Sequence, residues 1–132
     1  MIDCENEVYT KIVTMLRESF PGINTASMYI DAPSSFPHVS IVLSDNSIMA
    51  RTMDSGDYEV AICMFEINIY SNKEEGRKTE CKKIAKAIDD LLKPYNFRRM
   101  AMTPVPNMDD NSIYRLVMRY RVATDGKNFY RR

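Results

Sequence analysis

The sequence predicts a single α+β domain, in which a mainly antiparallel β-sheet carries two helices packed on it in the order αββ-βαββ. Two segments whose apolar residues recur every three or four positions predict the helices, and several segments of alternating apolar residues predict the strands. With 132 residues, 45% of them hydrophobic and 27% charged, the chain is long enough to bury a core without disulfide or metal support. We expect residues 1–132 to form one domain.

The first helix is predicted over residues 4–19. Asp3 is placed to cap its N-terminus, and Pro21 with Gly22 ends it. The predicted buried face consists of Val8, Ile12, Met15, Leu16 and Phe20.

Two short strands are predicted next, over residues 27–31 and 38–43, and a hairpin is the simplest arrangement for them. The connection between them is irregular because it is rich in proline and serine. Residues 44–57 lack a sustained period and carry many Asp, Asn, Ser and Gly residues. We interpret this segment as a long loop or projecting arm.

Residues 58–70 give the strongest strand pattern, and the change of alternation near Met64 and Phe65 predicts a bulge or burial on both faces. Ser71 with Glu74, or Asn72 with Glu75, forms a capping-box pattern for a second helix that ends near Pro94. Further strands are predicted over residues 97–103 and 113–123. Residues 125–132 are expected to be a mobile tail or a docking arm.

Catalytic and cofactor motifs are missing from the sequence. His38 is the single histidine, and we interpret it as a partly exposed strand residue. No spacing of His, Cys or acidic residues suits a metal, and no glycine-rich loop suits a phosphate. Cys63 and Cys81 are expected to be reduced core thiols, with only Cys4 free to react. We therefore expect no enzymatic activity, no metal and no cofactor.

Adjacent carboxylates occur twice, as Asp89-Asp90 and Asp109-Asp110. Consecutive helical residues point about 100° apart, so the first pair is expected on a solvated helix face. The second pair lies in a turn-rich loop, where Asp commonly bonds nearby backbone. No apolar run is long enough to cross a membrane, and the acidic N-terminus differs from a signal peptide.

Charge is balanced overall but divided along the chain, with a net charge of −6 for residues 1–92 and +6 for residues 93–132. On the last long strand Arg115, Arg119 and Arg121 share one alternation, while Tyr114 and Tyr120 share the other. This pattern predicts a basic ladder on one face. The ladder is either an ordinary solvent face or a contact surface whose partners are Glu side chains on an adjacent strand or another subunit.

Three methionines lie in predicted loops that are otherwise polar, and they are Met49, Met53 and Met108. Exposed methionine is typical of adaptable contact surfaces, whereas a loop methionine folded over the core is the alternative. We take these three residues and the arginines of the ladder as candidate interface residues.

The stretch from Tyr70 to Lys78 with its following helix, the segment from Pro104 to Asp110, and the strand from Ile113 to Arg121 together resemble small tail proteins of long-tailed bacteriophages and prophages. The resemblance is to tail terminator or tail-completion (head-tail joining) proteins and covers most of the chain. It implies a structural virion protein without catalytic residues, assembled in the bacterial cytoplasm.

The resemblance further implies a homohexameric ring that caps the tail tube and joins it to the head. Its implied partners are other copies of the chain and the tail-tube and head-closure proteins, with DNA passing through the ring lumen and no membrane. A head-closure or tail-tube subunit is the alternative within this class. A nucleic-acid-binding module is the alternative outside it, although its tyrosines would lie on the face opposite the arginines.

Overall fold

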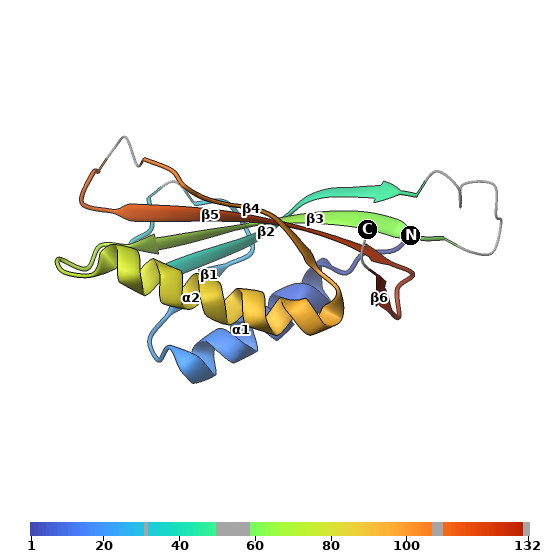
Figure 1. Ribbon diagram of the computed structural model, residues 1–132, viewed down its shortest axis with the longest axis horizontal. Helices are drawn as coiled ribbons and strands as arrows, with labels where there is room; N and C mark the ends of the chain where they lie inside the picture. The colour runs from blue at the N-terminus through green and yellow to red at the C-terminus, as the bar shows by residue number, and fades with distance from the viewer. Residues whose placement is uncertain (31, 50–58, 107–109, 131–132) are drawn as a thin grey trace.

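The computed structural model describes residues 1–30, 32–49, 59–106 and 110–130. Its elements are α1 (Glu5–Ser19), β1 (Asn24–Ala26), β2 (His38–Ile48), β3 (Ala61–Ser71), α2 (Arg77–Leu92), a 3-10 turn (Lys93–Tyr95), β4 (Arg98–Pro104), β5 (Tyr114–Thr124) and β6 (Phe129–Tyr130). The strand order is β1-β2-β3-β5-β4, with β6 paired to the end of β5 (Figure 1). The predicted α+β domain with two helices on a mainly antiparallel sheet is confirmed.

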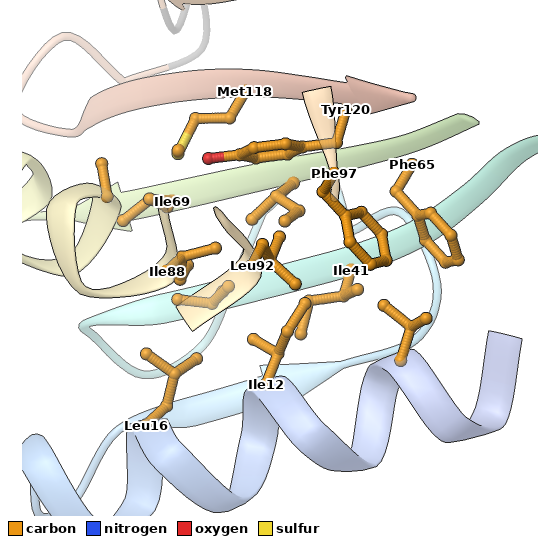
Figure 2. Close-up of a cluster of buried hydrophobic side chains, with 14 of the residues drawn as sticks. Ile12, Leu16, Ile41, Phe65, Ile69, Ile88, Leu92, Phe97, Met118 and Tyr120 are labelled. Atoms are coloured by element: carbon orange, nitrogen blue, oxygen red, sulfur yellow. The ribbon is translucent and has the colours of Figure 1, made fainter. Parts of the chain in front are cut away.

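Both helices lie on the same face of the sheet (Figure 1). The predicted α1 and α2 stripes are buried there, including Ile12, Leu16 and Ile88, each 0% exposed. Alternate residues of β2, β3 and β5 meet them, as Figure 2 shows for Ile41 and Met118. Among the described residues, no helix covers the other face of the sheet.

The first strand pair differs from the predicted hairpin. β1 lies earlier than predicted, and it pairs parallel to β2, with Asn24 opposite His38. A hairpin requires antiparallel strands, whereas residues 27–37 are long enough to return the chain to the starting end of β2. The local sequence of a strand this short does not distinguish a parallel from an antiparallel partner. The direction of the β1–β2 pair is therefore set by the arrangement of the whole sheet.

The predicted loop over residues 44–57 is wrong for its first part, because β2 continues to Ile48. Ser44 lies at a register shift between Leu43 and Asp45, and its hydroxyl donates to the Met64 carbonyl over 3.0 Å. Pairing with β3 supplies backbone hydrogen bonds that outweigh the low strand propensity of this polar stretch. Residues 50–58 lie outside the described part of the chain.

The central strand β3 is buried on both faces over its second half, as predicted, since every residue from Ile67 to Ser71 is buried. The irregularity near Met64 and Phe65 is on the partner strand β2. The extra residue, Ser44, lies on β2 between the residues that oppose Phe65 and Met64. An extra residue on either strand of an antiparallel pair shifts the register of the two strands in the same way.

The predicted capping box of α2 is wrong. The helix begins at Arg77 after Gly76, which has a left-handed φ of 86° that glycine adopts without strain. Ser71 belongs to β3, and its hydroxyl lies 2.6 Å from a carboxylate oxygen of Glu80. In α1, Asp3 accepts a bond from the Glu5 amide at 3.0 Å, close to the predicted capping role.

The end of the described chain contacts the core at one end of the sheet. The Phe129 ring lies 5.4 Å from that of Phe97, and Asn96 donates to the Phe129 carbonyl. Neither α1 nor α2, the two α-helices in the described ranges, is long and apolar enough to cross a membrane.

Candidate interaction surface

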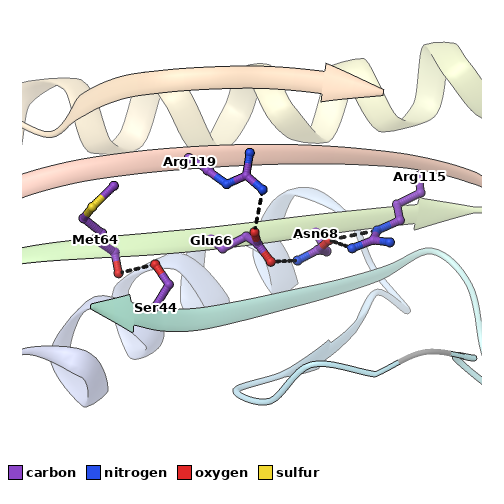
Figure 3. Close-up of polar contacts among 6 residues, drawn as sticks. All are labelled: Ser44, Met64, Glu66, Asn68, Arg115 and Arg119. Carbon is purple, nitrogen blue, oxygen red and sulfur yellow. Dashed lines mark hydrogen bonds and ion pairs between the residues drawn. The ribbon is translucent and has the colours of Figure 1, made fainter. Parts of the chain in front are cut away.

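The helix-free face of β3 and β5 carries a row of polar side chains. Its β5 members are the predicted ladder, Arg115, Arg119 and Arg121. The register places them opposite three β3 residues, in order Tyr70, Glu66 and Met64. We call the surface formed by Arg115, Arg119, Arg121, Glu66 and Asn68 the arginine face. Figure 3 shows four of these residues, Arg115, Arg119, Glu66 and Asn68.

Arg115 is held within the chain. Its Nε and Nη2 atoms donate to the Asn68 side-chain oxygen over 3.0 and 2.8 Å. Its guanidinium also lies 5.3 Å from the Tyr29 ring centre and 5.7 Å from that of Tyr70, within range of a cation–π interaction. Arg115 therefore orders the residues around it and is a weaker candidate for contact with a partner.

Arg119 is more accessible, with a side chain that is 52% exposed. It forms an ion pair of 3.1 Å with Glu66, which also accepts a 3.2 Å hydrogen bond from Asn68. The sequence left open whether the arginines of the ladder pair with glutamates on an adjacent strand. Arg119 does so, with Glu66 of β3. Figure 3 shows that these bonds join Arg119, Glu66, Asn68 and Arg115 into one network.

Arg121 has no charged partner within 4.0 Å among the described residues, and its buried Nε atom is without a hydrogen bond there. Arg98 of β4 lies opposite it in the register. Three guanidinium groups against the single Glu66 carboxylate make the arginine face basic, even after Arg119 is paired.

Glu66 and Asn68 were not singled out from the sequence as site residues. The available signal was the occurrence of a carboxylate and an amide inside the most apolar strand. Such side chains require polar partners when buried, and Asn68 is 0% exposed. Their partners come from β5, about fifty residues further along the chain.

Of the three candidate methionines, Met49 lies within the described residues. Met49 is 9% exposed and packs with Val60, Ala123 and Ile62. The alternative of a loop methionine folded over apolar neighbours therefore applies to it. Met53 and Met108 lie outside the described residues.

The β5 tyrosines, Tyr114 and Tyr120, lie on the face opposite the arginines, as the alternation predicts. Tyr120 is 1% exposed on the helix side, and its hydroxyl donates to an Asp89 carboxylate oxygen over 2.8 Å. Burial and this bond raise the pKa of Tyr120 above its usual value. Tyr29, from the β1–β2 connection, is the exposed aromatic residue beside Arg115.

His38 is buried rather than partly exposed, with 1% of its surface accessible. Neither ring nitrogen has a hydrogen-bond partner among the described residues, and the ring lies 5.9 Å from that of Tyr70. Burial lowers the pKa of His38. His38 begins β2, as predicted. Its burial depends on side chains from neighbouring elements, which the local sequence does not show.

The cysteines are all buried, which contradicts the expectation that Cys4 is free to react. The Cys4 sulfur lies 3.7 Å from that of Cys63, and its thiol proton points to that sulfur. This hydrogen bond and burial raise the pKa of Cys4, so the reactive thiolate is disfavoured. Burial raises the pKa of Cys81 to about 12.

The paired carboxylates have structural partners. Asp89 accepts the Tyr120 hydroxyl and lies 3.9 Å from Arg99, so it is not a purely solvated residue. Asp110 accepts bonds from the Ser112 amide and hydroxyl, as expected for a turn, and these bonds lower its pKa. No group of three metal-ligating side chains occurs in the described ranges.

Comparisons with known proteins add one finding. The fold matches a chain of a solved structure described as "Virion of native gene transfer agent (GTA) particle", with a TM-score of 0.62 and 12% sequence identity. The match covers 89% of this chain and 90% of that chain. No family model and no curated protein sequence matches. The protein therefore shares the α+β fold of a chain in a gene transfer agent virion.

Proposed function

We propose that the protein is a structural subunit of a phage or phage-like virion. The observation that carries this proposal is the end-to-end fold match to a chain of a gene transfer agent virion. The arginine face supports it, because it offers a basic contact surface for another subunit. Such a subunit acts by binding other subunits and is not an enzyme.

Within this class, we propose a tail terminator that forms a ring, most simply a hexamer, capping the tail tube and joining it to the head. The motif resemblance of the region from Tyr70 to Arg121 supports this position. Head-to-tail contacts close into a ring when the rotation between neighbours allows it. The partners would be other copies of the chain, the tail tube and the head-closure protein, with DNA passing through the lumen.

Arg119 and Arg121 are the residues of the arginine face that we propose contact an acidic partner surface. Arg115 would act by fixing Asn68, because two of its N–H groups donate to the Asn68 oxygen and its guanidinium lies beside the Tyr29 and Tyr70 rings. Met49 would support the end of the sheet through its apolar packing, and Met53 and Met108 remain proposed contacts in the adjoining segments.

The experiment compares two double charge reversals. In the test variant, Arg119→Glu and Arg121→Glu reverse the charge of an exposed and a half-buried residue of the arginine face. In the control, Arg17→Glu and Lys78→Glu make the same net charge change on exposed helix positions. Sedimentation velocity and negative-stain electron microscopy would follow assembly at several salt concentrations. We expect rings for the wild type and the control, and weakened, salt-sensitive assembly for the test variant.

A wild type that stays monomeric at high concentration would contradict the terminator proposal. Salt-sensitive DNA binding that the test variant abolishes would instead support the nucleic-acid-binding alternative.

A further inference from the structure

The sheet has two open edges. On one side, β1 covers β2 only from His38 to Ser40, so in the described structure no strand pairs with the outer side of β2 from Ile41 to Ile48. On the other side, β4 pairs with β5 alone. Unpaired edges present free backbone donors and acceptors to any strand that approaches them.

Exposed apolar side chains lie on both edges. Ile48 on β2 is 49% exposed, and Met100 and Met102 on β4 are 45% and 42% exposed. Soluble proteins usually protect such edges with charged residues. Apolar side chains at both ends of one sheet indicate that a partner strand covers them.

The backbone of Ile48 points outward from β2. The Met49 amide donates to the Val60 carbonyl over 2.8 Å, so Met49 faces β3. Adjacent residues of a strand direct their backbone groups to opposite sides. Ile48 therefore directs its N–H and C=O groups to the open edge.

The same reasoning applies to Met102 on β4. The Val105 amide donates to the Arg115 carbonyl over 3.0 Å, and this pairing continues the β4–β5 register. Val105 therefore faces β5, as does Thr103, two residues earlier. Met102 therefore directs its N–H and C=O groups outward. Pro104 also directs its C=O outward, and it has no N–H that could remain unpaired at an edge.

The two side chains also lie on the same face of the sheet. Ile48 is opposite Ala61, and Met102 is opposite Met118. Ala61 and Met118 belong to the core on the helix side. Met102 lines a shallow hollow there with residues of α2 and β4, which are Lys82, Ala85, Lys86, Asp89 and Arg99.

We propose that β4 of one subunit pairs with the open edge of β2 of the next, so that the sheet continues from copy to copy. This inference rests on the proposed ring. β2 and β4 run in opposite directions in the sheet, so the new pair is antiparallel. Ile48 lies opposite Met102, the two residues exchange both backbone hydrogen bonds, and the Ile48 side chain enters the hollow beside Met102.

This register agrees with the neighbouring residues. It places Ser47 opposite Thr103, and both lie on the helix-free side, since they oppose Ile62 and Val117 in their own sheets. Register shifts beside Ser44 and Met100 leave regular strand over residues 45–48 of β2 and 101–104 of β4, so in this register residues 46–48 pair with residues 102–104. Because one edge contacts a different edge, the contact is head-to-tail and is suited to a closed ring.

The test uses one variant for each edge, Ile48→Lys and Met102→Lys. The control is Met28→Lys, which makes the same kind of change at a 71% exposed residue outside both edges. We expect each edge variant alone to be monomeric by sedimentation velocity, while the control assembles like the wild type. An equimolar mixture of the edge variants should form a 1:1 dimer and nothing larger, because one intact β4 edge and one intact β2 edge remain.

The outcomes separate the two proposals. If the wild type forms rings and both edge variants do so as well, edge pairing is wrong and the proposed function stands. If the wild type does not associate, the ring itself is wrong. Circular dichroism would verify that each variant is folded.

A crosslinking experiment tests the register. Two single variants are prepared, Ser47→Cys and Thr103→Cys, each with no other change. Under mild oxidation with oxidised glutathione, they should form an interchain disulfide only when the two variants are mixed. Crosslinking of Thr103→Cys with itself would indicate pairing of two β4 edges and would overturn the head-to-tail arrangement.

Discussion

At the scale of single residues, polar groups buried on the helix-free face have partners that are distant in sequence. Asn68 illustrates this, because it donates to Glu66 and accepts from Arg115. Leaving a buried amide without a hydrogen bond lowers the stability of the fold by about 1–3 kcal/mol, and Arg115 avoids this loss by donating to Asn68. Two arginines of the predicted ladder thus belong to one network through Asn68 and Glu66, with a structural role at Arg115 and a more exposed position at Arg119, while Arg121 lies outside the network.

His38 leads to a prediction about pH. Because burial lowers its pKa, the folded chain binds fewer protons at this site than the unfolded chain does. The stability that this site contributes is therefore present above the unfolded pKa of about 6.5 and is lost as the pH falls below it. In His38→Phe, the free energy of unfolding should fall less steeply with acid, by up to about 1.4 kcal/mol per pH unit. Denaturant melts between pH 7.5 and 5 would measure the slopes, and equal slopes would contradict this assignment.

At the scale of elements, α2 shows how far periodicity alone determines packing. Its predicted apolar stripe is buried against β3 and β5, with Ile88 fully covered. Its predicted start was wrong, because Ser71 completes β3 and bonds Glu80 instead of capping the helix. A local capping pattern competes with strand pairing, and here Ser71, the first residue of the pattern, is the last residue of the strand.

Truncation of α2 residues gives a second prediction. Ile88→Ala should lower the free energy of unfolding by about 2 to 5 kcal/mol, because it leaves a cavity between helix and sheet. Lys86→Ala, on the exposed side of the same helix, should change it by about 0.5 kcal/mol or less. Equal, small effects in denaturant melts would show that the helix does not pack as described.

At the scale of the whole molecule, the charge division along the chain is reduced by folding. Arg119 pairs with Glu66, and Arg99 approaches Asp89, so cations of the C-terminal part meet carboxylates of the N-terminal part within one subunit. The −6 and +6 parts of the chain are therefore joined at these two ion pairs. Arg121 and Arg98, which lie opposite each other in the register, have no ion-pair partner within 4.0 Å among the described residues.

A third prediction concerns the molecule as a unit. The Cys4 and Cys63 sulfurs are 3.7 Å apart and unbonded, and no metal cluster occurs in the part of the chain that the structure describes. Thermal unfolding should therefore be unchanged by a chelator or by a reductant. A fall of many degrees in Tm with either reagent would show that a metal or a disulfide supports the fold.

The sequence by itself determined the fold class, the two helix stripes and the alternation of β5, because these depend on the repeat of apolar residues along a single element. Only the tertiary structure decided the parallel β1–β2 pair, the extension of β2 through a polar stretch and the burial of His38 and Cys4. Each of these depends on hydrogen bonds and covering atoms from another element. The same holds for the partner of Arg115 and for the outward backbone of Ile48 and Met102, since register between strands is a property of the assembled sheet.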